Sequence, residues 1–446
     1  MITRRPPPSL AIFVRPPAGL RLAAAALLLG GPLAAQADSL AGAARNAYRE
    51  AVAAERRGDL AAALGRAAAA AEAWPVQPFY LEAAAGYAAR AGDTTAVTKY
   101  LGRLAALGAG PVLPDAPFAA LAAVPSVAAA LRQVAANRVP LANSVAVATL
   151  PDTAFYPEGA DVDSATGDWF VASVRQRRLV RIDPAGRATD FGRLPAGRRL
   201  DAALGVRVDV ARRVVWLTTR VLPQMEDYRK DEPTRATVWA FSLPDGRLLG
   251  AATAEGTNHW FGDLVVAPDG SVILSDSESP VLYRARLGAG GVELVEVLRH
   301  RLFRSLQGLV FDEAGRRLYL ADYSHGLLLA DLAAGTVVPV SAPAGVTTLG
   351  IDGIARSGRS IVAVQNGIAP ARVVRFDLAA PGRIAAAVVI DRHLPLADEP
   401  TIGAVVGDRF VYVANSQWEK YAEDGSRRPG TVLAQPVLLS VPIGRP

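Results

Sequence analysis

The sequence contains no cysteine among its 446 residues. This absence excludes disulfide bonds, a lipid-modified cysteine anchor, thiolate metal sites and cysteine nucleophiles. Charged residues are also scarce, at 20% of the chain, whereas hydrophobic residues make up 51%. We therefore expect a core of ample size that packing alone has to stabilise.

Several chemical signatures are missing as well. The sequence has no Gly-x-Ser-x-Gly nucleophile elbow and no His-Glu-x-x-His zinc motif. No glycine-rich phosphate loop follows a strand and opens a helix. These absences argue against serine-hydrolase, zinc-protease and nucleotide-binding chemistry, and the sequence implies no organic cofactor.

The first 37 residues have the order of a secretory signal peptide. Four arginines precede an apolar run over residues 22–33, and Ala35-Gln36-Ala37 supplies small residues for cleavage before Asp38. The apolar run is shorter than the roughly 20 residues that a membrane-spanning helix needs. We therefore predict cleavage after Ala37, a periplasmic or secreted mature protein, and no stable membrane span.

The net charge of the chain resides largely in this leader. Removing residues 1–37 takes away four arginines and no acidic residue, which lowers the formal net charge from +6 by four, to +2. A nearly neutral mature chain offers no basic surplus for nucleic acid. We therefore expect no nucleic-acid partner.

Residues 38–139 predict a small all-α domain, because alanine and leucine recur here with helical periodicity. Gly58-Asp59-Leu60 returns as Gly92-Asp93-Thr94, 34 residues later, and this offset is the period of a tetratricopeptide repeat. Two repeats would span 44–77 and 78–111, with further helices near 118–121 and 127–134. The alternative is an alanine-rich helical stack with a chance period. Such a domain either recruits a protein partner or caps the domain that follows.

Beyond Pro140 short β-branched segments alternate with turns rich in Gly, Asp and Pro, which is typical of a many-stranded β domain. One unit recurs, with an apolar first strand, an Asp/Gly turn and a second strand that ends in polar residues. Its six copies begin at Pro157-Glu158-Gly159, Gly205, Asp263, Gly308, Asp352-Gly353 and Gly403. The spacing, about 44–58 residues, suits propeller blades. We predict a mainly β fold, with a six-bladed β-propeller over residues 140–446 after the tetratricopeptide-like domain.

Two further features support this prediction. A parallel α/β sheet would need a helix after each strand, but strand-like runs such as residues 179–183 occupy the intervals. The segment 144–148 precedes the first blade and has no blade of its own. We expect it to supply the outer strand of the last blade and so to close the ring.

The first strands of a propeller start, and the second strands end, at one common mouth. Polar residues gather at these positions, so we predict ligand-binding roles for His259, Arg207, Arg220, Asp322, Tyr323, His325, Gln365, Asn366, Asn415 and Trp418. Function is expected at this mouth, because the turns of the opposite face are plain hairpins.

Carboxylates that converge at this mouth need compensation. Two unit charges about 4 Å apart repel by about 4 kcal/mol at an effective dielectric constant near 20. A divalent cation, a raised carboxyl pKa, or arginines such as Arg207 and Arg220 would relieve the repulsion. Oxygen ligands favour calcium, manganese or magnesium over zinc.

At these residues the sequence resembles the senescence marker protein/gluconolactonase family, to which strictosidine synthase and paraoxonase are more distantly similar. The resemblance covers about residues 144–446. It implies one divalent cation on the axis, with Glu158 and Asp352 as ligands and Asp352 also as catalytic base for lactone hydrolysis. Gly262 stands where the family has an asparagine ligand, and Gln307 stands at the second asparagine. The predicted metal ligands are Glu158, Gln307 and Asp352, with Asp263, or alternatively Asn258, as a substitute oxygen donor for the missing asparagine.

The sequence therefore leaves two interpretations of function. In the first, an exported propeller binds a small polar ligand at its axial mouth and hydrolyses a lactone or ester. In the second, the propeller is a non-catalytic ligand sensor or scaffold, and the helices recruit a partner. Two long loops, 221–235 and 418–429, are expected at the mouth and would form a lid.

Overall fold

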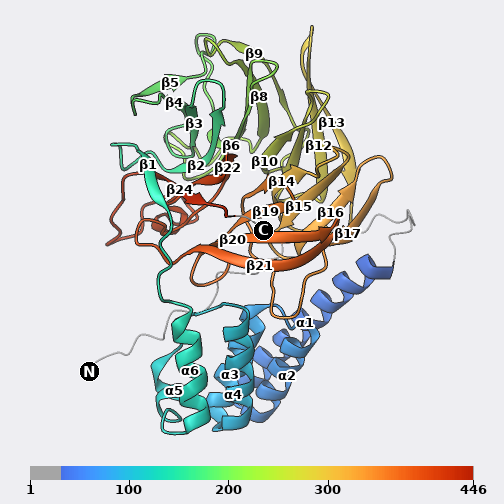
Figure 1. The fold of residues 1–446 in the computed structure, drawn as a ribbon, viewed down its shortest axis with the longest axis vertical. Coiled ribbons are helices and arrows are strands. Elements are labelled where there is room, and N and C mark those ends of the chain that lie inside the picture. The colour runs from blue at the N-terminus through green and yellow to red at the C-terminus, as the bar shows by residue number, and fades with distance from the viewer. Residues whose placement is uncertain (1–31, 445–446) are drawn as a thin grey trace.

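The computed structural model describes residues 32–444, in which six helices precede a ring of six four-stranded antiparallel sheets (Figure 1). The helices are α1 (Pro32–Arg56), α2 (Leu60–Ala73), α3 (Pro78–Ala91), α4 (Thr94–Ala106), α5 (Asp115–Ala119) and α6 (Pro125–Ala136). The predicted class, a mainly β six-bladed propeller after a few helices, is confirmed. No helix within residues 32–444 combines the length and the apolar character that crossing a membrane requires.

We call residues 32–139 the helical segment. Two positions 34 residues apart in this segment have the same structural role. Asp59 caps α2 by accepting a hydrogen bond from the Ala62 amide at 2.9 Å, and Asp93 caps α4 through the Ala96 amide at the same distance. An aspartate at this position satisfies an amide that the first helical turn leaves unpaired. The predicted helices after residue 111 are also present, as α5 and α6. The tetratricopeptide assignment itself stays a prediction.

The six blades follow one another along the chain. Blades 1 and 2 comprise β2 (Pro157–Asp163), β3 (Asp168–Ser173), β4 (Arg178–Ile182), β5 (Ala188–Phe191), β6 (Ala202–Asp209), β7 (Val214–Arg220), β8 (Ala236–Ser242) and β9 (Leu248–Thr253). Blades 3 and 4 comprise β10 (Phe261–Val266), β11 (Val272–Asp276), β12 (Val281–Gly288), β13 (Gly291–Arg299), β14 (Leu306–Phe311), β15 (Arg317–Asp322), β16 (Gly326–Asp331) and β17 (Thr336–Pro339). Blade 5 comprises β18 (Ile354–Ser357), β19 (Ser360–Gln365), β20 (Arg372–Ala380) and β21 (Arg383–Arg392).

Blade 6 closes the ring with strands from two distant parts of the chain. Its order is β22 (Gly403–Val406), β23 (Arg409–Val413), β24 (Val437–Pro442) and β1 (Val145–Thr149). Val145 pairs with Ser440 and Thr149 with Val437. The predicted closure is thus confirmed, and β1 covers an edge that β24 would otherwise expose.

Glycine follows several of the residues that face the axis because the inner strands of neighbouring blades approach closely there. A Cβ atom on Gly159 would lie 2.3 Å from the Leu204 carbonyl oxygen, and one on Gly308 would lie 2.6 Å from the Ile354 nitrogen. A larger residue at either position would force the inner strands apart. The recurring glycine of the sequence unit therefore sets the spacing around the mouth.

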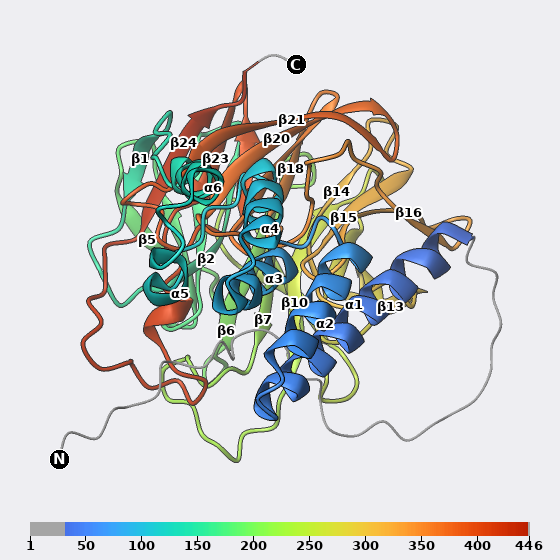
Figure 2. The same cartoon turned by 90° about the horizontal axis from the view of Figure 1, so that it is seen from below.

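The helical segment packs across the mouth face of the propeller (Figure 2). Ile368 of blade 5 is buried within the hydrophobic core of the helices. The Arg372 guanidinium donates to the Leu107 carbonyl at 3.0 Å, and the Gly110 amide donates to the Ala369 carbonyl at 2.7 Å. The ring of Trp74 lies 6.0 Å from that of His325. The helices therefore cap the propeller over blades 4 and 5.

The signal-peptide prediction concerns residues 1–37, most of which lie outside the described residues. The small-residue motif Ala35-Gln36-Ala37 falls in the first turns of α1, which begins at Pro32 rather than after Ala37. Cleavage and export stay predictions.

Candidate functional site

Two carboxylates, Glu158 and Asp352, face the axis and are both only partly buried. Glu158 lies on β2, where its Oε2 accepts a hydrogen bond from the Trp418 indole at 2.7 Å. Asp352 lies just before β18, where its Oδ2 accepts from the Asn366 side-chain amide at 2.8 Å. Blades 1 and 5 thus each present one carboxylate, and each carboxylate is held by a single side-chain donor.

The pKa values of these two groups differ from those of free carboxyls. Burial, and then the charge of Asp352, raise the pKa of Glu158 well above its usual value. Burial raises the pKa of Asp352 to about 6, and the hydrogen bond from Asn366 opposes that rise. No arginine or lysine within residues 32–444 forms an ion pair with either carboxylate. The two carboxyl groups interact, and both hold a proton more readily than free carboxyl groups do.

Asp263 interacts with both carboxylates of this pair but has a cationic partner of its own. Its side chain on β10 is buried, and its Oδ2 accepts from the Arg207 guanidinium at 2.8 Å. Burial raises the pKa of Asp263 to about 7, while Arg207 acts in the opposite direction. The sequence left open whether a cation, a raised pKa or an arginine relieves the repulsion between the carboxylates. At Asp263 an arginine contributes to this relief.

The residues of the mouth do not assemble the four-ligand cation site that the family resemblance implies. A Cβ on Gly262 would lie 2.9 Å from the Ser277 hydroxyl, so other side chains fill the space that an asparagine would need. Gln307 donates its amide to the Ser305 hydroxyl at 3.3 Å. Among residues 32–444 no group of three or more His, Cys, Asp or Glu is placed to hold a metal ion. The cation stays an expectation from the resemblance, and no step below depends on it.

A cleft of about 1220 Å³ separates the helical segment from the mouth. The helical side contributes Gly110, Val112 and Arg138, and the propeller side includes Tyr323, Asn366, Glu399 and Trp418. Asn366 and Trp418 are the donors that hold Asp352 and Glu158, so the two carboxylates lie behind the wall of this cleft. Three of the predicted ligand-binding residues, Tyr323, Asn366 and Trp418, therefore face a space large enough for a small molecule.

Other predicted ligand-binding residues are engaged within the fold. Buried Asp322 accepts from the amides of Arg304, Ser305, Ser324 and His325. Gln365 donates to the carbonyls of Thr347 and Leu349, and Asn415 bonds the backbone of Gln435 and Val437. The His325 Nδ1 contacts the Leu302 carbonyl at 3.0 Å. These side chains shape the mouth loops rather than face the cleft.

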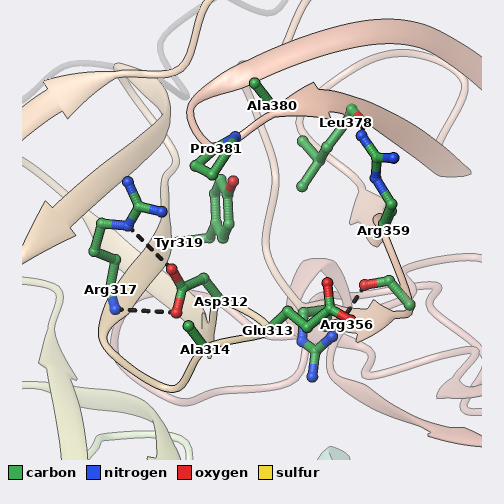
Figure 3. A pocket seen from close by; sticks show the side chains of 11 residues that line it. Asp312, Glu313, Ala314, Arg317, Tyr319, Arg356, Arg359, Leu378, Ala380 and Pro381 are labelled. Carbon is green, nitrogen blue, oxygen red and sulfur yellow. Dashed lines mark hydrogen bonds and ion pairs between the residues drawn. The ribbon is translucent and has the colours of Figure 1, made fainter.

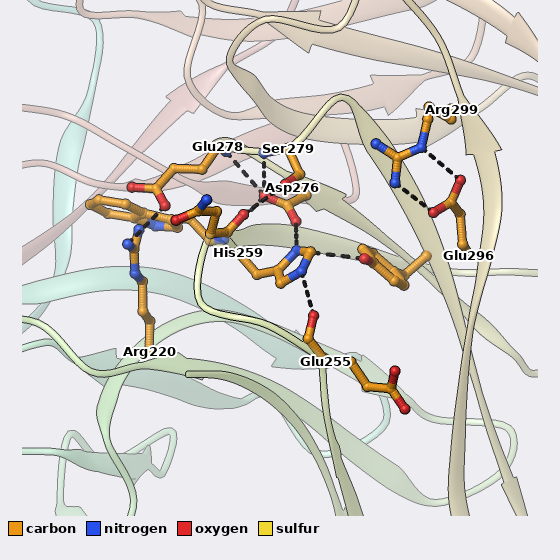
Figure 4. A network of polar contacts seen from close by, with 11 residues as sticks. Arg220, Glu255, His259, Asp276, Glu278, Ser279, Glu296 and Arg299 are labelled. Carbon is orange, nitrogen blue, oxygen red and sulfur yellow. Dashed lines mark hydrogen bonds and ion pairs between the residues drawn. The ribbon is translucent and has the colours of Figure 1, made fainter. Parts of the chain in front are cut away.

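His259 is also fully engaged (Figure 4). Its Nδ1 lies 2.6 Å from Asp276 Oδ2, and its Nε2 lies 2.8 Å from the Glu255 carbonyl oxygen. Both ring nitrogens of His259 therefore lie against oxygen atoms of the protein. His259 thereby fixes the loop before β10 and has no nitrogen left for a ligand.

Arg220 lies beside this network and supports an aromatic wall. Its guanidinium donates to Glu278 at 2.9 Å and covers the Trp260 ring at 4.4 Å. The Trp260 ring in turn lies 5.9 Å from the ring of Trp418. Arg220 therefore acts on the mouth through Trp260.

The two predicted lid loops pack against one another over blades 1 and 2. Met225 of the first loop and Tyr421 of the second are buried in one hydrophobic cluster. Gln224 donates to the Ala422 carbonyl at 3.2 Å, and Tyr421 stacks on Tyr156 with centroids 5.1 Å apart. These loops close one side of the mouth, and the helical segment covers another.

Sequence reasoning missed Glu399. This residue lines the cleft, and burial together with the nearby Glu419, Asp398 and Asp352 raises its pKa to about 7. Its signal in the sequence is its place four residues before Gly403, the start of the sixth repeated unit. Pro-Thr-Ile separates Glu399 from Gly403, whereas Glu158 directly precedes Gly159. The two glutamates therefore do not look equivalent in the sequence.

A second pocket, of about 320 Å³, lies on the opposite face between blades 4 and 5 (Figure 3). Arg317 is paired with Asp312 at 3.0 Å. Arg356 and Arg359 donate to the carbonyls of Gly358 and Ala379. Its arginines therefore already have partners, and the pocket is remote from Glu158 and Asp352.

Fold and site together define a six-bladed β-propeller whose mouth holds a carboxylate pair beneath a helical cap. No protein-family model matches the chain, and no curated protein matches it. Among solved structures, it is similar to a gluconolactonase from Xanthomonas campestris (15% identity, 69% of this chain and 93% of that chain, TM-score 0.44). It is also similar to virginiamycin B lyase from Staphylococcus aureus (11% identity, 66% and 82%, TM-score 0.43). At this level of similarity the comparison adds nothing to the fold that the sheets already define.

Proposed function

We propose that the protein binds a small polar ligand in the cleft beneath the helical segment and hydrolyses a lactone or ester bond in it. The observation that carries the proposal is the pair Glu158 and Asp352, whose donors Trp418 and Asn366 line the cleft. The sequence resemblance to gluconolactonases supports the same chemistry.

The two carboxyl groups take different parts in the proposed hydrolysis. With a pKa of about 6, Asp352 is largely ionised near neutral pH and takes a proton from water. The hydroxide oxygen attacks the carbonyl carbon as that proton leaves. Glu158, whose pKa burial and then the charge of Asp352 raise well above its usual value, is the proposed acid and donates a proton to the departing alkoxide oxygen. The ring opens or the ester splits, and proton exchange with water restores both groups.

The test is hydrolysis of a panel of aliphatic lactones and aryl esters by the mature protein after treatment with a chelator. We expect Asp352→Asn and Glu158→Gln each to lower kcat/KM by on the order of a hundredfold or more. Glu423→Gln is the matched control, because this exposed carboxylate lines the same cleft. Equal activity in all three variants, or no turnover of any substrate by the unaltered protein, would refute hydrolysis.

A non-catalytic ligand sensor is the second candidate, and one observation favours it. The helical segment contacts the loop of blade 5 that also holds Asp352. Ligand binding at the mouth would then be sensed by the helices. Ligand-dependent stabilisation without turnover would favour this function.

We also propose that the protein works outside the cytoplasm. The leader over residues 1–37 supports this location.

A further inference from the structure

The loop between β19 and β20 joins the helical segment to the candidate acid–base pair. Gln365 and Arg372 pair across the base of this hairpin, and residues 366–371 form its tip. The Arg372 Nε donates to Gln365 Oε1 at 2.7 Å, which ties the two strands together. The tip projects from the mouth toward the helices.

The first residue of the tip holds Asp352. Asn366 donates its side-chain amide to Asp352 Oδ2 at 2.8 Å and to the Pro400 carbonyl at 2.9 Å. The same nitrogen thus links blade 5 to the segment that leads into blade 6. Its direction is fixed by two acceptors, so a displaced loop would move the donor away from the carboxylate.

The remainder of the tip is anchored in the helices. Ile368 is 3% exposed and belongs to the hydrophobic core of the helical segment. The Ala369 carbonyl accepts from Gly110, and Arg372 donates to the Leu107 carbonyl just beyond the end of α4. A cation near the last carbonyls of a helix is favourable. The helices therefore hold the loop by apolar packing and by two hydrogen bonds.

We propose that the helical segment positions Asp352 through this loop and that Asn366 is the positioning residue. The assignment of Asp352 as a proton acceptor rests on the proposed function, whereas the mechanical connection does not. A partner or ligand that displaces the end of α4 would withdraw Asn366 and leave the carboxylate without its donor. The helical segment is then a control element of the mouth as well as its cover.

The groups around Asp352 show why the hydrogen bond from Asn366 matters. The charged and titratable groups that interact with it are Glu158 on β2, Asp263 on β10, Tyr323 after β15 and Glu399 before β22. None of these four carries a positive charge. The neutral side-chain amide of Asn366 is therefore the hydrogen-bond donor that orients the Asp352 carboxylate.

The side-chain amide of Asn366 provides a direct readout that needs neither ligand nor activity. The mature full-length protein would be labelled with ¹⁵N-asparagine, and the Asn366 signals identified by their loss in Asn366→Ser. We expect Ile368→Ala to move these signals upfield, toward those of a free amide, and Ile368→Val to restore most of the original shift. Leu81→Ala is the matched control, because it removes a buried side chain from α3 in the same core.

Unmoved Asn366 signals in a folded Ile368→Ala protein would overturn the inference, as would equal movement in Leu81→Ala. If Ile368→Ala does not fold, Arg372→Lys takes its place, because Arg372 donates to both Gln365 and the Leu107 carbonyl, and unmoved Asn366 signals in that variant would overturn the inference. Where hydrolysis is found, Ile368→Ala should lower kcat at least tenfold with KM within about twofold. A protein without hydrolysis, but with the expected movement of the Asn366 signals, would refute the proposed function and leave this inference intact.

Discussion

Arg207 and Asp263 form a buried ion pair next to the axis of the propeller, with 2.8 Å between Nη2 and Oδ2. The pair joins neighbouring blades, because Arg207 belongs to β6 and Asp263 to β10. The Arg207 charge offsets part of the burial cost of one carboxylate of the mouth. Among residues 32–444, Glu158, Asp352 and Glu399 have no ion pair of this kind.

We expect Arg207→Ala to destabilise the protein by about 3–5 kcal/mol, because it leaves the buried charge of Asp263 unpaired. Arg286→Ala serves as control, since it removes an exposed ion pair with Asp269 that contributes less than about 1 kcal/mol. Denaturant unfolding of both variants measures the difference. Equal effects would show that the Asp263 pair is unimportant for stability.

Stability should fall as the pH rises from about 4 to about 7. The pKa values of Asp352, Asp263 and Glu399 in the folded protein are about 6, about 7 and about 7, above those of the unfolded chain. The folded state binds more protons than the unfolded chain in this window. The stability that these three groups contribute in this way is fully present below about pH 4 and is lost as they ionise in the folded protein.

At pH 8, Asp352→Asn should therefore stabilise the protein by about 1–2 kcal/mol, because it removes a repelled charge. Thermal melts at pH 5 and pH 8 test both statements. Glu423→Gln, at an exposed site, should leave the difference between the two melts unchanged. A melting temperature that rises steadily from pH 5 to pH 8 would contradict the prediction.

Divalent cations should have little effect on stability. A ligand at 100 times its Kd stabilises by about 2.7 kcal/mol, so a bound calcium or manganese ion would be seen readily in a melt. We expect no such shift because the Asp263 carboxylate is already paired and Gly262 provides no ligand. A raised melting temperature, with metal recovered by elemental analysis, would restore the cation implied by the family resemblance.

Closure of the ring should depend on β1. A chain that starts at residue 140 keeps this strand, whereas one that starts at residue 156 lacks it. We expect the shorter chain to lose cooperative unfolding, because β24 would be left as an open edge. The longer chain should unfold cooperatively, although the loss of the helices uncovers Ile368 and lowers its stability. Circular dichroism melts distinguish the two, and equal melts would argue against closure by β1.

Export predicts a mature amino terminus at Asp38. Amino-terminal sequencing of protein recovered from the periplasm or the medium measures this directly. Recovery of a chain that still contains Arg21 would contradict cleavage.

The propeller could be predicted from sequence because its repeat is local. Each blade places glycine and acidic turns at recurring positions, and the closing strand had no other blade to join. The pair Glu158 and Asp352 could be found for the same reason, since both precede a glycine at the start of a repeated unit.

Other parts of the site depend on contacts between distant segments, which no repeat records. The ion pair of Asp263 was one of several alternatives, and only the geometry of two blades selects it. The docking of the helices relies on Ile368 and Arg372, which look like ordinary strand and loop residues in the sequence. The contacts of His259 could not be predicted either, because they depend on where the Glu255 carbonyl lies.

The seam of blade 6 also has a consequence for folding. Val145 must find Ser440 across nearly the whole propeller, so the final sheet forms only after the last blade has been synthesised. Contacts of such sequence separation slow folding, because the chain between them has to be ordered first. Until β24 arrives, β1 is unpaired and β23 is paired only with β22, so both present open edges that could associate with other chains. The two halves of this seam are kept apart until late in folding. The nascent protein therefore most needs protection from aggregation at this seam.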